Sequence, residues 1–223
     1  RITSKVLQCP ISTSIGYTPA TRVLDTVYVF GGHTNANNLY AYSIEHNTFE
    51  KVEKRGEWPT ARYGHSAFCL GGKLYVAGGS NVSDCWCYDP ETGGWTREAD
   101  APVGFGCSAT VTAGIGRERV VHIIGSNWTQ KLHLTFSLSE GWKRETDLPF
   151  SSCFAGGVCI GSEIHLLSDR FSQTKVHVYN TQTKQWRQNY DLPVMVGDCR
   201  ACLIGPRTVI VCSKQDMVVG EML

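Results

Sequence analysis

A run of apolar residues that ends in small residues recurs five times along the chain. The two clearest copies are residues 27–32 (VYVFGG) and 74–79 (LYVAGG). Weaker copies end at Gly125-Ser126, Ser168-Asp169 and Ser213-Lys214, so that successive copies are 43 to 47 residues apart. A fixed period of this length is typical of repeat proteins, in which each unit buries its faces against its neighbours.

Three further markers follow the same period. An aromatic residue begins a strand-like segment in each unit, an aromatic six or seven residues earlier precedes it, and a proline closes the unit. The three sets are Phe49, Trp95, Trp142 and Trp186; Tyr42, Tyr88, Phe136 and Tyr179; and Pro59, Pro102, Pro149 and Pro193. Each unit therefore holds about four short strands between turn signals. Four-stranded units of this size cover their faces by radial stacking, which predicts an all-β propeller.

The second unit carries the sharpest pattern. Residues 62–66 (RYGHS) open it, Gly78-Gly79 end its second strand, and residues 88–95 (YDPETGGW) join its third and fourth strands. This pattern closely resembles a kelch repeat, in particular the kelch domain of BTB-kelch ubiquitin-ligase adaptors. The third and fourth units lack the second glycine, and the first unit has Phe49 in the place of tryptophan.

We therefore expect a single kelch-type β-propeller of about five four-stranded blades over residues 1–223. The predicted units are residues 11–59, 60–102, 103–149, 150–193, and 194–223 completed by 1–10. The last blade lacks a fourth strand at its C-terminal end, and residues 3–10 end in a proline as the fourth strands do. Pairing both termini in one sheet would remove an exposed edge. A fragment of a larger propeller with six or seven blades is the alternative.

Composition excludes several classes of function. The 21 basic and 20 acidic residues leave a net charge of +1, which gives no basic surface for nucleic acid, and no apolar stretch is long enough to cross a membrane. The chain begins with arginine and shows no signal peptide, so we expect a piece of a longer protein. Ten cysteines, several of them in apolar strands, favour a reducing, cytoplasmic setting, although Asn81 and Asn127 stand in glycosylation sequons.

The sequence shows no catalytic or metal motif, and we expect no enzyme activity, cofactor or metal. Neither a G-x-S-x-G nor an H-E-x-x-H pattern is present. Cys199 and Cys202 have a C-x-x-C spacing, but on a strand they would face opposite sides. The alignment of units places His65, Cys107, Cys153 and Cys199 at one position facing the channel. We interpret them as small side chains that pack around the axis.

The resemblance implies a partner-binding face, built from the residue after each glycine position and from the loop that opens each unit. The residues that match these positions are His33, Arg62, Tyr63, Ser80, Phe105, Asn127, Ser151, Ser152, Arg170 and Asp198. It also implies a non-enzymatic module that recognises a protein or peptide substrate for a cullin-type E3 ligase, assembled through domains outside this chain. The alternatives are a secreted or periplasmic-type kelch enzyme, a carbohydrate-binding propeller and a cytoskeletal scaffold.

Overall fold

The computed structural model describes residues 16–33, 37–212 and 217–221. These residues form nineteen β-strands and one short 3-10 helix (Gly116–Glu118). All strand pairs are antiparallel, and the strands group into five separate sheets. Within the described ranges, no helix is long and apolar enough to span a bilayer.

Each sheet is a meander of strands that are consecutive in the chain. The first sheet comprises β1 (Ala20–Val23), β2 (Thr26–Phe30), β3 (Leu39–Ser43) and β4 (Thr48–Lys51), and the second β5 (Ser66–Leu70), β6 (Lys73–Ala77), β7 (Cys85–Asp89) and β8 (Gly94–Glu98). The third comprises β9 (Ala109–Ala113), β10 (Val120–Ile124), β11 (His133–Ser137) and β12 (Gly141–Arg144). The fourth comprises β13 (Gly156–Ile160), β14 (Glu163–Leu167), β15 (Lys175–Asn180) and β16 (Gln185–Asp191), and the fifth β17 (Arg200–Leu203), β18 (Thr208–Cys212) and β19 (Met217–Glu221).

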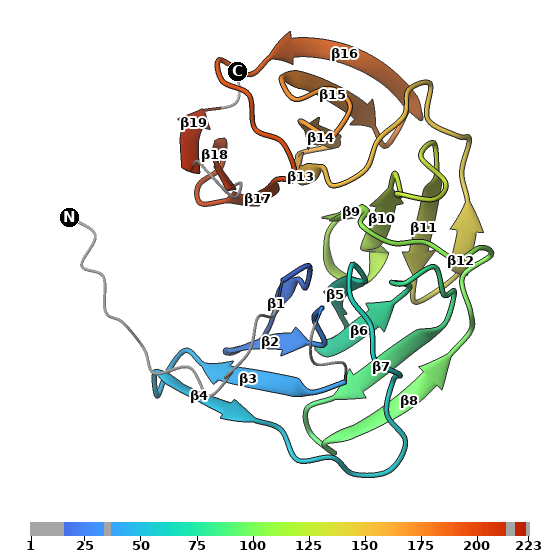
Figure 1. The fold of residues 1–223 in the computed structure, drawn as a ribbon, viewed down its shortest axis with the longest axis vertical. Helices are drawn as coiled ribbons and strands as arrows, with labels where there is room; N and C mark the ends of the chain where they lie inside the picture. Colours follow the sequence, from blue (N-terminus) through green and yellow to red (C-terminus); the bar gives the residue numbers. More distant parts are fainter. Residues whose placement is uncertain (1–15, 34–36, 213–216, 222–223) are drawn as a thin grey trace.

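The five sheets are the blades of a propeller, as predicted. They stand around a central space, with β1, β5, β9, β13 and β17 innermost and β4, β8, β12 and β16 outermost (Figure 1). The fifth blade contains three strands among the described residues. The fourth strand predicted for it at residues 3–10 lies outside them.

The hydrophobic core lies between blades rather than within them. Phe30 and Leu39 of the first blade pack with Leu74, Val76 and Trp95 of the second in one buried cluster. Three equivalent clusters join the second blade to the third, the third to the fourth and the fourth to the fifth. The repeated aromatics are part of this packing, since the Trp95 ring lies 5.3 Å from the ring of Phe30. The period of the sequence is therefore the period of the blade interfaces.

The glycine positions keep their backbone conformation even where glycine has been replaced. Gly31, Gly78 and Gly125 have φ angles of +70°, +66° and +70°. Ser168 takes the same place in the fourth blade with φ +50°, and its single hydroxyl proton is shared between the carbonyls of Gln173 and Val196. These side-chain bonds help to hold a left-handed conformation that normally favours glycine. The weakened sequence motif thus still produces the same turn.

Candidate partner-binding face

Main-chain hydrogen bonds link the opening loops of all five blades around one mouth of the central channel. Tyr17 O accepts from Gly64 N at 2.7 Å, Gly64 O from Cys107 N at 2.6 Å, Cys107 O from Phe154 N at 2.7 Å, and Phe154 O from Cys199 N at 3.0 Å. The first four residues have positive φ angles between +56° and +64°. We call these five residues, which the four bonds join in series from the first blade to the fifth, the backbone ring. In this ring Cys107 is equivalent to Gly64 and Phe154. The sequence alignment, which paired Cys107 with His65 and Cys153, was therefore wrong by one residue in the second and the fourth blade.

In the first three blades, a second set of bonds joins the loop after the glycine position to the opening loop of the next blade. Gly32 N donates to Arg62 O at 3.0 Å, Gly79 N to Phe105 O at 2.8 Å, and Ser126 N to Ser152 O at 3.0 Å. Both kinds of loop therefore lie at the same end of the propeller. We call this end the rim face.

Aromatic side chains gather at the mouth on the rim face. The Tyr63 ring lies 5.1 Å from the His33 ring and 6.5 Å from the Tyr17 ring, and Tyr17 is 5.9 Å from Phe154 in an edge-to-face contact. Tyr17, His33 and Tyr63 are partly or largely exposed, whereas Phe154 is buried beneath them. This arrangement brings the first, second and fourth blades together at one rigid aromatic cluster.

An arginine extends this cluster over the fourth and fifth blades. The Arg170 guanidinium lies 4.1 Å from the centre of the Phe154 ring, a cation–π contact. It also binds both carboxylate oxygens of Asp198, at 2.9 Å and 3.3 Å. Hydrogen bonding to Asp198 raises the pKa of Arg170 above its ordinary value. The ion pair with Asp198 holds the Arg170 guanidinium, the Arg170 fork, in place. Half of the Arg170 side chain is exposed, so a partner can still reach it.

The predicted contact residues divide into three groups by exposure. His33, Tyr63, Ser80 and Arg170 are exposed, and Asn127, Ser151 and Asp198 are half-buried. Three of the predicted residues, Arg62, Phe105 and Ser152, are buried. Burial removes these three side chains from the set that a partner could touch in this structure, which corrects the prediction for them.

Arg62 is buried because it joins strand ends inside the second blade. Only 2% of the residue is exposed, and its guanidinium binds both oxygens of Asp84 at 2.6 Å and 2.7 Å. It also donates to the carbonyls of Thr60 and Gly78. Burial would raise the pKa of Asp84, but hydrogen bonds from Arg62 and Trp86 lower it below its usual range. Arg62 is thus a structural residue of the blade.

Phe105 and Ser152 are buried by the close approach of the glycine turns. The nearest atom of the Phe105 ring lies 2.6 Å from the position that a Cβ on Gly78 would take. The same ring packs against Trp142. The Ser152 carbonyl lies 2.3 Å from the position of a Cβ on Gly125. The opening loops therefore pack their apolar and small residues inward, against the glycines of the preceding blade.

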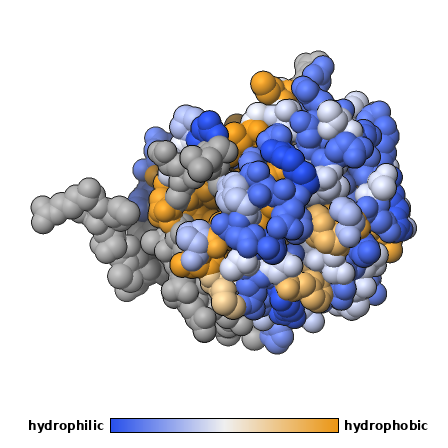
Figure 2. Space-filling view, turned by 90° about the horizontal axis from the view of Figure 1, so that it is seen from above, coloured by the Kyte–Doolittle hydropathy of each residue, from blue (hydrophilic) through white to orange (hydrophobic). Residues whose placement is uncertain are grey.

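Several exposed side chains of the rim face escaped the sequence-based prediction. Trp128 is 44% exposed and Phe171 is 50% exposed, and each directly follows a predicted residue, Asn127 and Arg170. Of the thirteen large hydrophobic side chains exposed among the described residues, seven lie in rim-face loops. They are Tyr17, Tyr63, Val82, Trp128, Phe171, Val194 and Met195. Their signal in the sequence was only an apolar residue inside a turn-rich loop. Figure 2 views the molecule from its edge, at 90° to Figure 1, and shows apolar residues in separate patches among hydrophilic ones.

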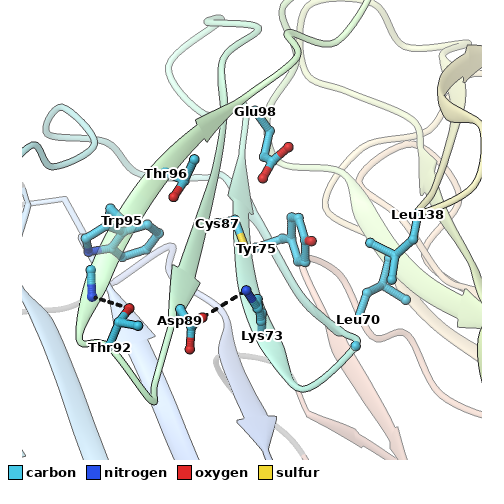
Figure 3. Close-up of a pocket in the computed structure, with 12 residues that line it drawn as sticks. Leu70, Lys73, Tyr75, Cys87, Asp89, Thr92, Trp95, Thr96, Glu98 and Leu138 are labelled. Carbon is cyan, nitrogen blue, oxygen red and sulfur yellow. Dashed lines mark hydrogen bonds and ion pairs between the residues drawn. The ribbon is translucent and has the colours of Figure 1, made fainter.

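A surface pocket of about 400 Å³ lies at the opposite hairpins of the second blade (Figure 3). Lys73 and Asp89 within it form an ion pair at 2.8 Å, which raises the pKa of Lys73 and lowers that of Asp89. Tyr75, Cys87 and Glu98 line the rest of its wall. Its lysine and aspartate pair with each other, and the pocket lies at the end of the strands opposite the rim loops. Among the described residues, no three His, Cys, Asp or Glu side chains converge as metal ligands would.

Comparisons with known proteins agree with this architecture. Residues 12–139 match the family model of the KLHDC2/KLHL20/DRC7 Kelch-repeats domain. Kelch-like protein 35 of Mus musculus is 26% identical over 202 residues, which are 85% of this chain and 34% of that protein. Rab9 effector protein with kelch motifs of Xenopus laevis is 36% identical over 81 residues, which are 34% of this chain and 22% of that protein.

A solved structure, that of YjhT, superposes with a TM-score of 0.74 at 16% identity and covers 93% of this chain and 74% of that one. This likeness concerns the fold. The chain spans about a third or less of the length of the curated relatives it matches.

Proposed function

Because the chain belongs to the KLHDC2/KLHL20/DRC7 Kelch-repeats domain family, we propose that it is a non-enzymatic module that binds a segment of a partner protein across the rim face. The observation that carries this proposal is the cluster of Tyr17, His33 and Tyr63 beside the Arg170 fork. Aromatic and arginine side chains dominate the energetics of protein interfaces. Because the backbone ring holds the loops in place, a partner would bind with little ordering cost.

The finer proposal is that the module selects substrates for a cullin-type E3 ubiquitin ligase in the cytoplasm. Its support is the similarity to Kelch-like protein 35 over most of this chain. The cullin-binding part would lie in segments beyond the 223 residues. A partner recognised at the rim face would then be ubiquitinated and degraded.

The test uses the full-length protein expressed in cells, with partners identified and quantified by affinity purification and mass spectrometry. The rim variant combines Tyr63→Ala with Arg170→Ala. The control combines Ile115→Ala with Arg22→Ala, at hairpins of the opposite end, where Arg22 pairs with Asp25 at 3.3 Å much as Arg170 pairs with Asp198. Loss of a hot spot should weaken binding of the direct partner about 30-fold or more.

Two readouts separate the coarse proposal from the finer one. Partners that bind the wild-type protein and the control but not the rim variant support binding at the rim face; equal capture by all three proteins contradicts it. If the ligase assignment is correct, blocking cullin neddylation should raise the abundance of the rim-dependent partners. If blocking neddylation does not change the abundance of the rim-dependent partners, the ligase role is refuted and the binding role still stands.

A further inference from the structure

Two exposed cysteines lie on one face of the fifth blade. Cys202 of β17 and Cys212 of β18 are exposed, whereas the other cysteines of the described residues are buried or half-buried. On the opposite face of these strands, Ala201, Val209 and Val211 pack against the fourth blade. Because alternate residues of a strand point to the same side, Cys202 and Cys212 point away from the fourth blade. Both residues line a channel cavity of about 450 Å³.

Exposure separates these two thiols chemically from the other cysteines that the structure describes. The thiolate, not the thiol, is the form that attacks disulfides and other electrophiles. Burial raises the pKa of each of the other cysteines, to about 11 in Cys107, Cys153 and Cys199. At neutral pH those thiols are therefore protonated, and solvent reaches them poorly. A dissolved reagent should react first at Cys202 or Cys212.

Arg200 gives Cys212 a positively charged neighbour. The two residues stand directly opposite each other in the pairing of β17 with β18, where Cβ atoms are about 4.5–5.5 Å apart. Within the described ranges, the Arg200 guanidinium donates one hydrogen bond, to the carbonyl of Cys199 at 3.1 Å, and pairs with no carboxylate. The described residues that line the cavity include no aspartate and no glutamate. A negatively charged reagent is therefore attracted to the part of the cavity where Cys212 lies.

The pairing of the strands also distinguishes Cys202 from Cys212. The Cys202 thiol donates to the carbonyl of Leu203 at 3.4 Å, whereas the Cys212 thiol makes no hydrogen bond with another described residue. Cys202 is paired with Ile210 and is therefore the diagonal neighbour of Cys212. Diagonal neighbours are about 7–8 Å apart, which exceeds the Cα separation of about 4.4–6.8 Å in a disulfide. Cys212 is thus the available nucleophile, and the sheet keeps Cys202 too far away to bond with it.

We propose that Cys212 is a site of reversible thiolation by a small anionic disulfide, such as oxidised glutathione. The Cys212 thiol loses its proton to solvent, and its thiolate attacks one sulfur of the reagent. A new S–S bond joins Cys212 to one half of the reagent, and the other half leaves as a thiolate. Cys212 is thereby oxidised and the departing half is reduced, while Arg200 attracts the carboxylates of the attached half. The site lies in the channel, apart from the contacts proposed for a partner at the rim face.

The experiment treats the purified, reduced protein with oxidised glutathione at neutral pH and measures the adduct at each cysteine by peptide mass spectrometry. Cys212 should carry the glutathione adduct at a rate at least about tenfold above that of the buried Cys107, Cys153 and Cys199. Dithiothreitol should remove the adduct. Cys212→Ser should abolish it, and because Cys212 is exposed this variant should keep the fold, which circular dichroism checks.

Two synthetic disulfides test the role of Arg200. Dithiobis(nitrobenzoate) carries two carboxylates, and dithiodipyridine is neutral. The rate due to Cys212 is the difference between each protein and the same protein with Cys212→Ser. Arg200→Gln should slow the reaction with the carboxylate reagent at least about threefold at low ionic strength, and added salt should remove the difference. The reaction with the neutral reagent should keep its rate.

Arg22→Gln is the matched control. Like Arg200, Arg22 is an exposed arginine of an innermost strand, but it pairs with Asp25 at 3.3 Å. This variant should react with both reagents at the wild-type rates. An adduct spread evenly over buried and exposed cysteines, or an internal disulfide in place of the glutathione adduct, would overturn the proposal. Equal slowing of the carboxylate reagent by Arg200→Gln and Arg22→Gln would overturn it as well.

Discussion

Among single residues, Arg62 illustrates how the role of a side chain depends on where its loop turns. It lies in an opening loop beside the exposed Tyr63, yet its guanidinium points into the blade and meets Asp84. Removing one partner of a buried ion pair leaves the other charge uncompensated, which typically costs 3–5 kcal/mol. Arg62 therefore acts on stability, and any effect of its loss on partner binding would follow from unfolding.

Arg62→Ala is expected to lower the free energy of unfolding by about 3–5 kcal/mol, measured by urea denaturation. Arg97→Ala is the control, because Arg97 pairs with Asp100 at 3.1 Å on the surface, where such pairs contribute about 0–1 kcal/mol. Similar small losses in both variants would contradict the structural role assigned to Arg62.

Residue-level predictions from the sequence were therefore only partly successful. The positions of the rim loops followed from the repeat, but the direction of each side chain did not. Arg62 and Asp84 are 22 residues apart, and nothing in the sequence pairs them. The exposed rings of Trp128 and Phe171 depend likewise on the course of a loop rather than on a period.

At the scale of the strand and turn, the glycine after β6 combines two requirements. Gly78 needs a positive φ, and it also needs space, because a Cβ would lie 2.6 Å from the Phe105 ring. Gly93, in the turn between β7 and β8, has a similar φ of +70° but nothing within 4 Å of a Cβ. The two positions allow the costs of conformation and of crowding to be measured separately.

Gly93→Ala should cost about 1–2 kcal/mol of stability, the cost of a left-handed conformation for alanine. Gly78→Ala should cost a further 1–3 kcal/mol, because the methyl group forces Phe105 to move in a packed core. Chemical denaturation of both variants gives the difference. Equal losses would mean that the interface between the second and third blades tolerates the added methyl group.

Elements were the most predictable level of the structure. Strands follow the alternation and the apolar runs, and glycines and prolines separate them, so local chemistry was enough to place four strands in each of four blades. The degraded motifs also folded as expected, because Ser168 replaces a glycine with the aid of its own hydrogen bonds. The strand predicted at residues 3–10 remains a prediction.

For the whole molecule, buried histidines tie stability to pH. His122 and His133 lie between the third and fourth blades, with Nδ1 of one 3.0 Å from Nε2 of the other. Burial lowers the pKa of His122 to about 3, with a smaller contribution from His133, and burial lowers the pKa of His133 to about 4. His65 is lowered to about 3 as well. In the unfolded chain the same groups bind protons near pH 6.5.

The unfolded state therefore binds more protons than the native state, and stability should fall as the pH drops from 6.5 to about 4. Each of these histidines contributes a slope of up to about 1.4 kcal/mol per pH unit. Asp84, whose depressed pKa also stabilises the fold, adds its loss only below pH of about 4. Urea denaturation between pH 7 and 4 measures the slope. His122→Asn should flatten it, and an unchanged slope in that variant would exclude this histidine as a source.

The backbone ring has a consequence for how such a face can change over generations. Its bonds run between peptide groups, and the residues at its five places are a tyrosine, a glycine, two cysteines and a phenylalanine. The shape of the mouth is thus fixed by atoms that every amino acid except proline supplies. Neighbouring side chains can be exchanged one at a time while the frame that displays them persists. A scaffold of this kind can acquire a new specificity without first acquiring a new architecture.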